Sequence, residues 1–128
     1  MNKKKLREEA ELYFMPFLLG SNRHSHALAL KIFRKYGICS YILDSKRSFG
    51  DVINPTGSFW RLFGDDGELL CEQLIKLATA EPYTLPILIP TSTEYARFTD
   101  GQRQRLETVF VLCEPDKVFS DSPFTDIF

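Results

Sequence analysis

The sequence has few cysteines, no excess of charge and no long hydrophobic run, and each absence excludes a class of protein. The three cysteines, Cys39, Cys71 and Cys113, form no C-x-x-C pair, so they cannot build a zinc ribbon or a thioredoxin-type site. Sixteen basic and seventeen acidic side chains give a net charge of −1, whereas a domain that binds duplex nucleic acid is normally basic. The apolar run at 14–19 is too short to span a bilayer.

Length and aromatic content indicate one folded domain. The 128 residues include eleven Phe, five Tyr and one Trp, a content typical of a packed core and not of a disordered chain. We expect the domain at residues 14–116, a helical extension at 1–13, and a tail or the start of a further domain at 117–128. The extension is acidic where a secretory signal would be apolar, which predicts a soluble, cytoplasmic protein that binds neither nucleic acid nor membranes.

Apolar runs alternate with amphipathic segments along this domain. The runs predict strands at 14–19, 38–43, 59–63, 85–90 and 109–112. The intervening segments predict a helix at 26–36 ended by Gly37, a helix opened by Asp65, and one or two short helices before Thr108. This alternation predicts an α/β, three-layer, Rossmann-like fold with a mostly parallel sheet of about five strands. The predicted core is Leu18, Leu28, Ile32, Phe33, Ile42, Leu70, Leu74, Leu88, Ile89 and Phe110.

Three loops follow the carboxyl ends of predicted strands, where parallel sheets bind their ligands. The first begins Gly20-Ser21-Asn22-Arg23, and it lacks both G-x-G-x-x-G and G-x-x-x-x-G-K-[ST]. Its backbone amides and Arg23 could hold a small anion at 20–25, at the start of a helix. The same residues could equally form an ordinary strand-to-helix turn with Ser25 as the N-cap.

The second loop carries charged side chains. Asp44 could accept hydrogen bonds from a ribose, and Lys46 and Arg47 could meet a phosphate or a carboxylate. Alternatively, these are solvated surface charges.

The third loop supplies three hydroxyl groups at a strand end, from Thr91, Ser92 and Thr93. Helix capping accounts for one of them, and the other two favour a ligand. His24 and His26 have no evident third metal ligand, so we assign no metal site. No catalytic triad or general acid–base pair can be assembled, and we assign no catalytic residue.

Several segments, taken in order, resemble the N-terminal preATP-grasp domain of ATP-grasp carboxylate–amine ligases, such as D-aspartate ligase and the carbamoyl-phosphate-synthase-like proteins. They are FLLGSN at 17–22, ALAL at 27–30 with GI at 37–38, LDSKRS at 43–48, LIPTSTEY at 88–95 and RLE at 105–107. The resemblance extends over residues 14–116.

The resemblance implies a role on the substrate side of a ligase. Such enzymes use ATP and Mg²⁺ to activate a carboxylate as an acyl-phosphate, which an amine then attacks. In the family the ATP- and Mg²⁺-binding subdomains follow this domain, so we expect no cofactor and no activity in this chain alone. Its expected partners are a small carboxylate or amino acid, an ATP-grasp catalytic domain in cis or in trans, and a second copy in a homodimer.

The resemblance also places residues along one wall of the ligase cleft. These are Gly20, Ser21, Asn22, Asp44, Lys46, Arg47, Thr91, Ser92 and Thr93. Arg23 and His24 depart from the smaller residues of the family, which leaves the substrate's identity open. The alternative is an independent Rossmann-like module that binds a small anion or a nucleotide.

Overall fold

The computed structural model describes residues 14–47, 50, 57–80 and 85–113. The elements, in chain order, are β1 (Phe14–Leu19), α2 (Arg23–Tyr36), β2 (Ser40–Asp44), β3 (Gly57–Arg61), α4 (Gly67–Thr79), β4 (Leu85–Pro90), α5 (Thr93–Gly101), α6 (Arg103–Leu106) and β5 (Val111–Leu112). The predicted extension at 1–13 and tail at 117–128 lie outside the described residues, as does Ser48 at the end of the second loop.

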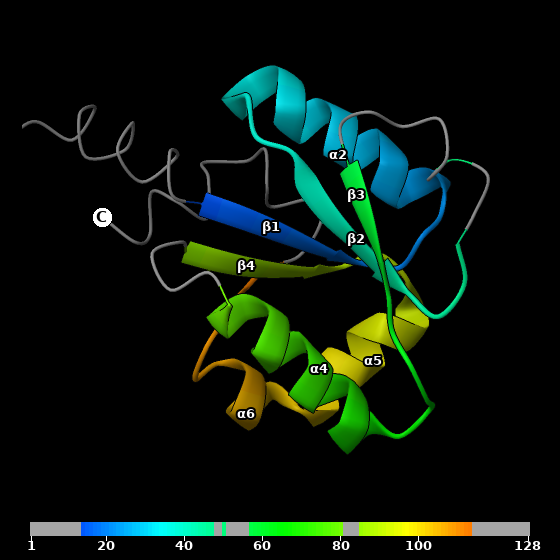
Figure 1. The fold of residues 1–128 in the computed structure, drawn as a ribbon, viewed down its shortest axis with the longest axis vertical. Helices are drawn as coiled ribbons and strands as arrows, with labels where there is room; N and C mark the ends of the chain where they lie inside the picture. Colours follow the sequence, from blue (N-terminus) through cyan, green and yellow to red (C-terminus); the bar gives the residue numbers. More distant parts are fainter. Residues whose placement is uncertain (1–13, 48–49, 51–56, 81–84, 114–128) are drawn as a thin grey trace, which may run out of the picture.

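The described residues form a three-layer α/β structure (Figure 1). Five strands form one sheet in the order β3-β2-β1-β4-β5, and every neighbouring pair is parallel. Helix α2 covers one face of the sheet, and α4, α5 and α6 lie on the other (Figure 1). The predicted Rossmann-like α/β class is therefore confirmed.

The central strand β1 is apolar throughout, and residues 16–19 of it are buried, as burial on both faces of a parallel sheet requires. Leu18 belongs to the cluster on the α2 face, whereas Phe17 and Leu19 belong to the cluster under α4. Pro16 is also buried, although a central strand normally excludes proline. The pairing of β1 with β2 begins only at Phe17, so at Pro16 the strand has a ladder partner on the β4 side alone.

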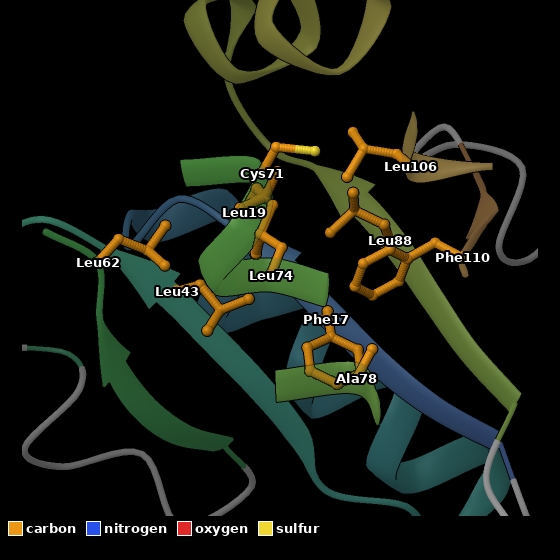
Figure 2. Close-up of a cluster of buried hydrophobic side chains, with 10 residues drawn as sticks. All are labelled: Phe17, Leu19, Leu43, Leu62, Cys71, Leu74, Ala78, Leu88, Leu106 and Phe110. Atoms are coloured by element: carbon orange, nitrogen blue, oxygen red, sulfur yellow. The ribbon is translucent and has the colours of Figure 1, made fainter. Parts of the chain in front are cut away.

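Two apolar clusters hold the layers together. The cluster on the α2 face contains Leu18, Leu28, Ala29, Ile32, Ile42, Ile87, Ile89 and Cys113. Figure 2 shows the other cluster, in which Cys71, Leu74 and Ala78 of α4 pack over β1, β2 and β4 and meet Leu106 and Phe110.

Eight of the ten predicted core residues are buried, and two predictions are wrong. Phe33 is 40% exposed because α2 turns Leu28, Ala29 and Ile32 toward the sheet and leaves Phe33 at its flank. Leu70 is only partly buried because the buried stripe of α4 runs through Cys71, Leu74 and Ala78.

Capping groups move the helix starts away from their predicted positions. Asn22, and not Ser25, is the N-cap of α2; its side chain accepts from the Ser25 amide at 2.8 Å, and its own amide donates to the Ser25 hydroxyl at 2.9 Å. The reciprocal pair starts the helix at Arg23, three residues before the predicted start. Asp66, and not Asp65, caps α4. The prediction that Gly37 ends α2 is confirmed, and Gly37 adopts the left-handed conformation with φ 72°.

Candidate functional site

A cleft of about 720 Å³ opens at the carboxyl ends of the central strands. The chain proceeds from β1 to β2 and β3 on one side, then returns to β4 on the other side of β1, so the order reverses between β1 and β4. Ligands of open α/β sheets bind at this position. The cleft is lined by Gly20, Asn22, Asp44, Ser45, Gly64, Asp65, Gly67, Leu70, Ser92, Thr93, Glu94, Tyr95 and Phe98.

Asp44 connects three elements at the wall of this cleft. One carboxylate oxygen accepts from the Ser21 amide at 2.8 Å, which ties the end of β2 to the loop after β1. The other accepts from the Ser45 amide at 2.7 Å and from the Tyr95 hydroxyl at 2.8 Å. These bonds fix the orientation of the carboxylate and leave it part of its accepting capacity.

Thr91 ties the ends of β1 and β4 together beneath the cleft. Its hydroxyl donates to the Leu19 carbonyl at 2.6 Å and accepts from the Asn22 side-chain amide at 3.1 Å. Thr91 is buried and does not line the cleft, so its hydroxyl is accounted for by structure. Gly20 lies against it, with φ 114°, and a Cβ at Gly20 would stand 2.5 Å from the Thr91 hydroxyl oxygen.

The start of α5 also lines the cleft. Ser92 is the N-cap, and its hydroxyl accepts from the Tyr95 amide at 3.2 Å. Helix capping thus accounts for the Ser92 hydroxyl, and the hydrogen bond between strand ends accounts for the Thr91 hydroxyl. Thr93 is exposed in the cleft wall beside Glu94, at the end of the helix where backbone N–H groups lack helical partners.

The charge of the lining is acidic. Asp44, Asp65 and Glu94 line the cleft, and no Lys, Arg or His is among the described residues that do so. Carboxylates and hydroxyls favour a ligand group that donates hydrogen bonds or carries positive charge.

The predicted basic residues lie elsewhere. Arg23, Lys46 and Arg47 are exposed and outside the lining, and the Arg47 guanidinium lies 5.9 Å from the centre of the Phe59 ring. Ser21 contacts the site through its backbone amide, which donates to the Asp44 carboxylate. The anion at 20–25 remains a prediction, because nothing in the structure tests it.

Tyr95, Asp65 and Glu94 were not among the predicted site residues. Burial, followed by the hydrogen bond to the Asp44 carboxylate, raises the pKa of Tyr95 above its ordinary value of 10.0. The phenol therefore remains a hydrogen-bond donor to Asp44 at neutral pH. Its position offered a signal, because Tyr95 lies in the first turn of the helix after β4 and such a residue can face the strand ends.

Replacing Tyr95 with phenylalanine should lower stability most at neutral pH. The lost hydrogen bond to a carboxylate should cost about 1.5–3 kcal/mol of unfolding free energy. Because the folded pKa is raised, this contribution is present below pH 10.0, the ordinary pKa, and declines as the unfolded tyrosine ionises above it. Urea unfolding of the natural chain and of Tyr95→Phe, repeated from neutral to alkaline pH, should show their free energies of unfolding converging as pH rises. A difference in unfolding free energy that stays constant across this pH range would contradict a stabilising hydrogen bond from Tyr95 to Asp44.

The described residues hold no metal-ligand cluster. None of their His, Cys, Asp and Glu side chains gather in a group of three or more that could hold a metal ion. Within the same residues, no helix combines the length and the apolar character needed to cross a membrane. The groups that line the cleft are suited to binding a polar molecule.

Comparisons with known proteins do not assign the chain to a family. No protein-family model matches it, and neither the curated proteins nor the solved structures give a significant match. The resemblance to preATP-grasp domains thus rests on the sequence segments at 17–22, 27–30, 37–38, 43–48, 88–95 and 105–107, and on a fold class that many unrelated proteins share.

Proposed function

We propose that this chain is the substrate-side domain of an ATP-dependent carboxylate–amine ligase, and that its cleft holds an amino-acid substrate. The observation that carries the proposal is the cleft itself, a concave site at the strand-order reversal lined by carboxylates and hydroxyls. The ligase class comes from the resemblance of the sequence segments, and the kind of substrate from the chemistry of the lining.

The acidic lining favours the amino group of such a substrate. A protonated amine near Asp65 and Glu94 would gain roughly 1 kcal/mol per carboxylate in a water-like environment at 4 Å, and up to about 4 kcal/mol where solvent is partly excluded. The cleft is open, so the smaller figure applies to the isolated chain. We therefore expect weak binding that falls as salt is added.

The substrate's carboxylate would face the start of α5. The first backbone N–H groups of a helix lack helical partners, and the helix dipole adds partial positive charge there. Thr93 and Glu94 occupy this position in the cleft wall. Together with the carboxylates of Asp44 and Asp65 elsewhere in the lining, this end of α5 suits a zwitterion better than a bare anion.

ATP and Mg²⁺ are assigned to a catalytic domain in cis or in trans. The described residues lining the cleft include no cation to meet phosphate oxygens, and no metal-ligand group is found among the described residues. The described residues therefore do not fit a nucleotide–magnesium complex, and we assign them only the holding of the amino-acid substrate.

Binding is tested by NMR titration of the chain with amino acids, and separately with methylamine, acetate and phosphate. We expect shifts at Gly20, Ser45 and Thr93 with amino acids. Asp65→Asn and Glu94→Gln should each weaken binding about two- to fivefold, by analogy with exposed ion pairs. Arg34→Gln on the exposed face of α2 is the matched control and should change nothing.

Other outcomes discriminate among the alternatives. Phosphate binding that weakens in Arg23→Ala or Lys46→Ala would support an independent anion-binding module instead. Shifts confined to the part of α4 beyond Leu70, which does not line the cleft, would refute the cleft assignment. The ligase class is tested by reading the gene past residue 128, and its neighbours, for an ATP-grasp catalytic domain. Amine ligation by that domain should then require this chain.

A further inference from the structure

Strand β3 forms one edge of the sheet (Figure 1). It pairs with β2 along all five of its residues, from Gly57 opposite Ser40 to Arg61 opposite Asp44. On its outer side no described residue pairs with it. The other edge of the sheet, β5, has only two residues, so β3 is the longer edge within the described part of the chain.

The outward-facing backbone groups of β3 can be identified from one hydrogen bond. The Leu62 amide donates to the Asp44 carbonyl at 2.8 Å, so the backbone of Leu62 faces β2. Successive residues of a strand direct their N–H and C=O groups to opposite sides within the sheet. Ser58 and Trp60 therefore also face β2, whereas Gly57, Phe59 and Arg61 direct their backbone groups away from the sheet.

We propose that β3 of a second copy of this chain pairs antiparallel with this edge, about a two-fold axis at Phe59. In that register Phe59 of one copy lies opposite Phe59 of the other, and Gly57 of each copy lies opposite Arg61 of the other. Each such pair exchanges two N–H···O bonds in an antiparallel ladder. The three outward residues are symmetric about Phe59, so every outward N–H and C=O of the three finds a partner.

The side chains fit the same register. Ser58 would lie directly opposite Trp60 of the second copy, so a small side chain faces a large one on the face that carries α4. Trp60 is 46% exposed although it stacks edge-on against Tyr41, with ring centres 5.9 Å apart. The second copy would cover this indole. Strand β3 contains no lysine and no proline, and its one charged residue, Arg61, would lie opposite Gly57 of the second copy.

The interface is small, so the dimer should dissociate on dilution. Sedimentation velocity of the whole chain over a concentration series measures this equilibrium. Arg61→Pro removes an outward N–H and leaves the ladder with β2 intact, and it should weaken the dimer about tenfold because both copies lose a bond. Ser58→Lys adds a charge at an exposed position and should weaken it similarly. Arg61→Ala keeps the N–H and is the control, with no change expected.

Amide exchange gives a readout that other dimers would not reproduce. As concentration rises, exchange should slow at Gly57, Phe59 and Arg61 and stay constant at Ser58 and Trp60, which β2 already protects. If Arg61→Pro fails to fold, Ser58→Lys and the exchange pattern still decide the question. A monomer at every concentration would overturn the proposal, as would a dimer that responds to neither substitution.

Discussion

Replacing Leu18 with alanine is expected to lower the free energy of unfolding by about 2–5 kcal/mol. Leu18 is fully buried in the central strand, on the face covered by α2, where it belongs to one cluster with Leu28, Ile32 and Ile89. Strand β1 is paired with β2 on one side and with β4 on the other, so the surrounding backbone cannot easily move to fill the cavity that Leu18→Ala leaves. Ile89→Ala, at the paired position of β4, should cost a similar amount.

Leu30→Ala is the matched control for this loss. Leu30 lies on α2 and is 37% exposed, so the same substitution should change the unfolding free energy by about 0.5 kcal/mol or less. Urea unfolding followed by circular dichroism measures all three variants. Equal losses for Leu18→Ala and Leu30→Ala would contradict the burial of β1 between two helical layers.

The order and type of the elements could be predicted because each has a local signature. The run at 14–19 is apolar without alternation, which is what burial on both faces of a parallel sheet requires. The element ends were less predictable because they depend on which of several nearby polar groups caps the helix. Asn22 and Ser25 are both good N-caps, and only the reciprocal bonds between them decide that α2 begins at Arg23.

The location of the candidate site could be predicted, but its charge could not. The strand ends follow from the topology, so Gly20, Asp44 and Ser92 were expected near one another, and they line one cleft. The direction of a long exposed side chain is not encoded locally, and neither Lys46 nor Arg47 lines the cleft. The acidic lining also depends on which other loops reach the cleft, a tertiary property that no single segment contains.

Replacing Gly20 with alanine should lower the free energy of unfolding by about 3 kcal/mol or more. Its φ of 114° is one that side-chain-bearing residues rarely adopt, at a cost of about 1–3 kcal/mol. In addition, the new Cβ would stand 2.5 Å from the Thr91 hydroxyl oxygen, so Thr91 would have to move. That movement would disturb the Thr91 bonds to the Leu19 carbonyl and the Asn22 side chain.

Two other glycines separate backbone strain from close contact. Gly37 has φ 72°, and a Cβ added there would have no atom within 4 Å, so Gly37→Ala should cost only the strain, about 1–2 kcal/mol. Gly101 has open space and no positive φ, so Gly101→Ala should be neutral or slightly stabilising. Urea unfolding ranks the three variants, and a loss in Gly20→Ala no larger than that in Gly37→Ala would show that Thr91 does not crowd Gly20. With the expected ranking, Gly20→Ala should also weaken amino-acid binding in the NMR titration, because Thr91 and Asn22 support the wall of the cleft.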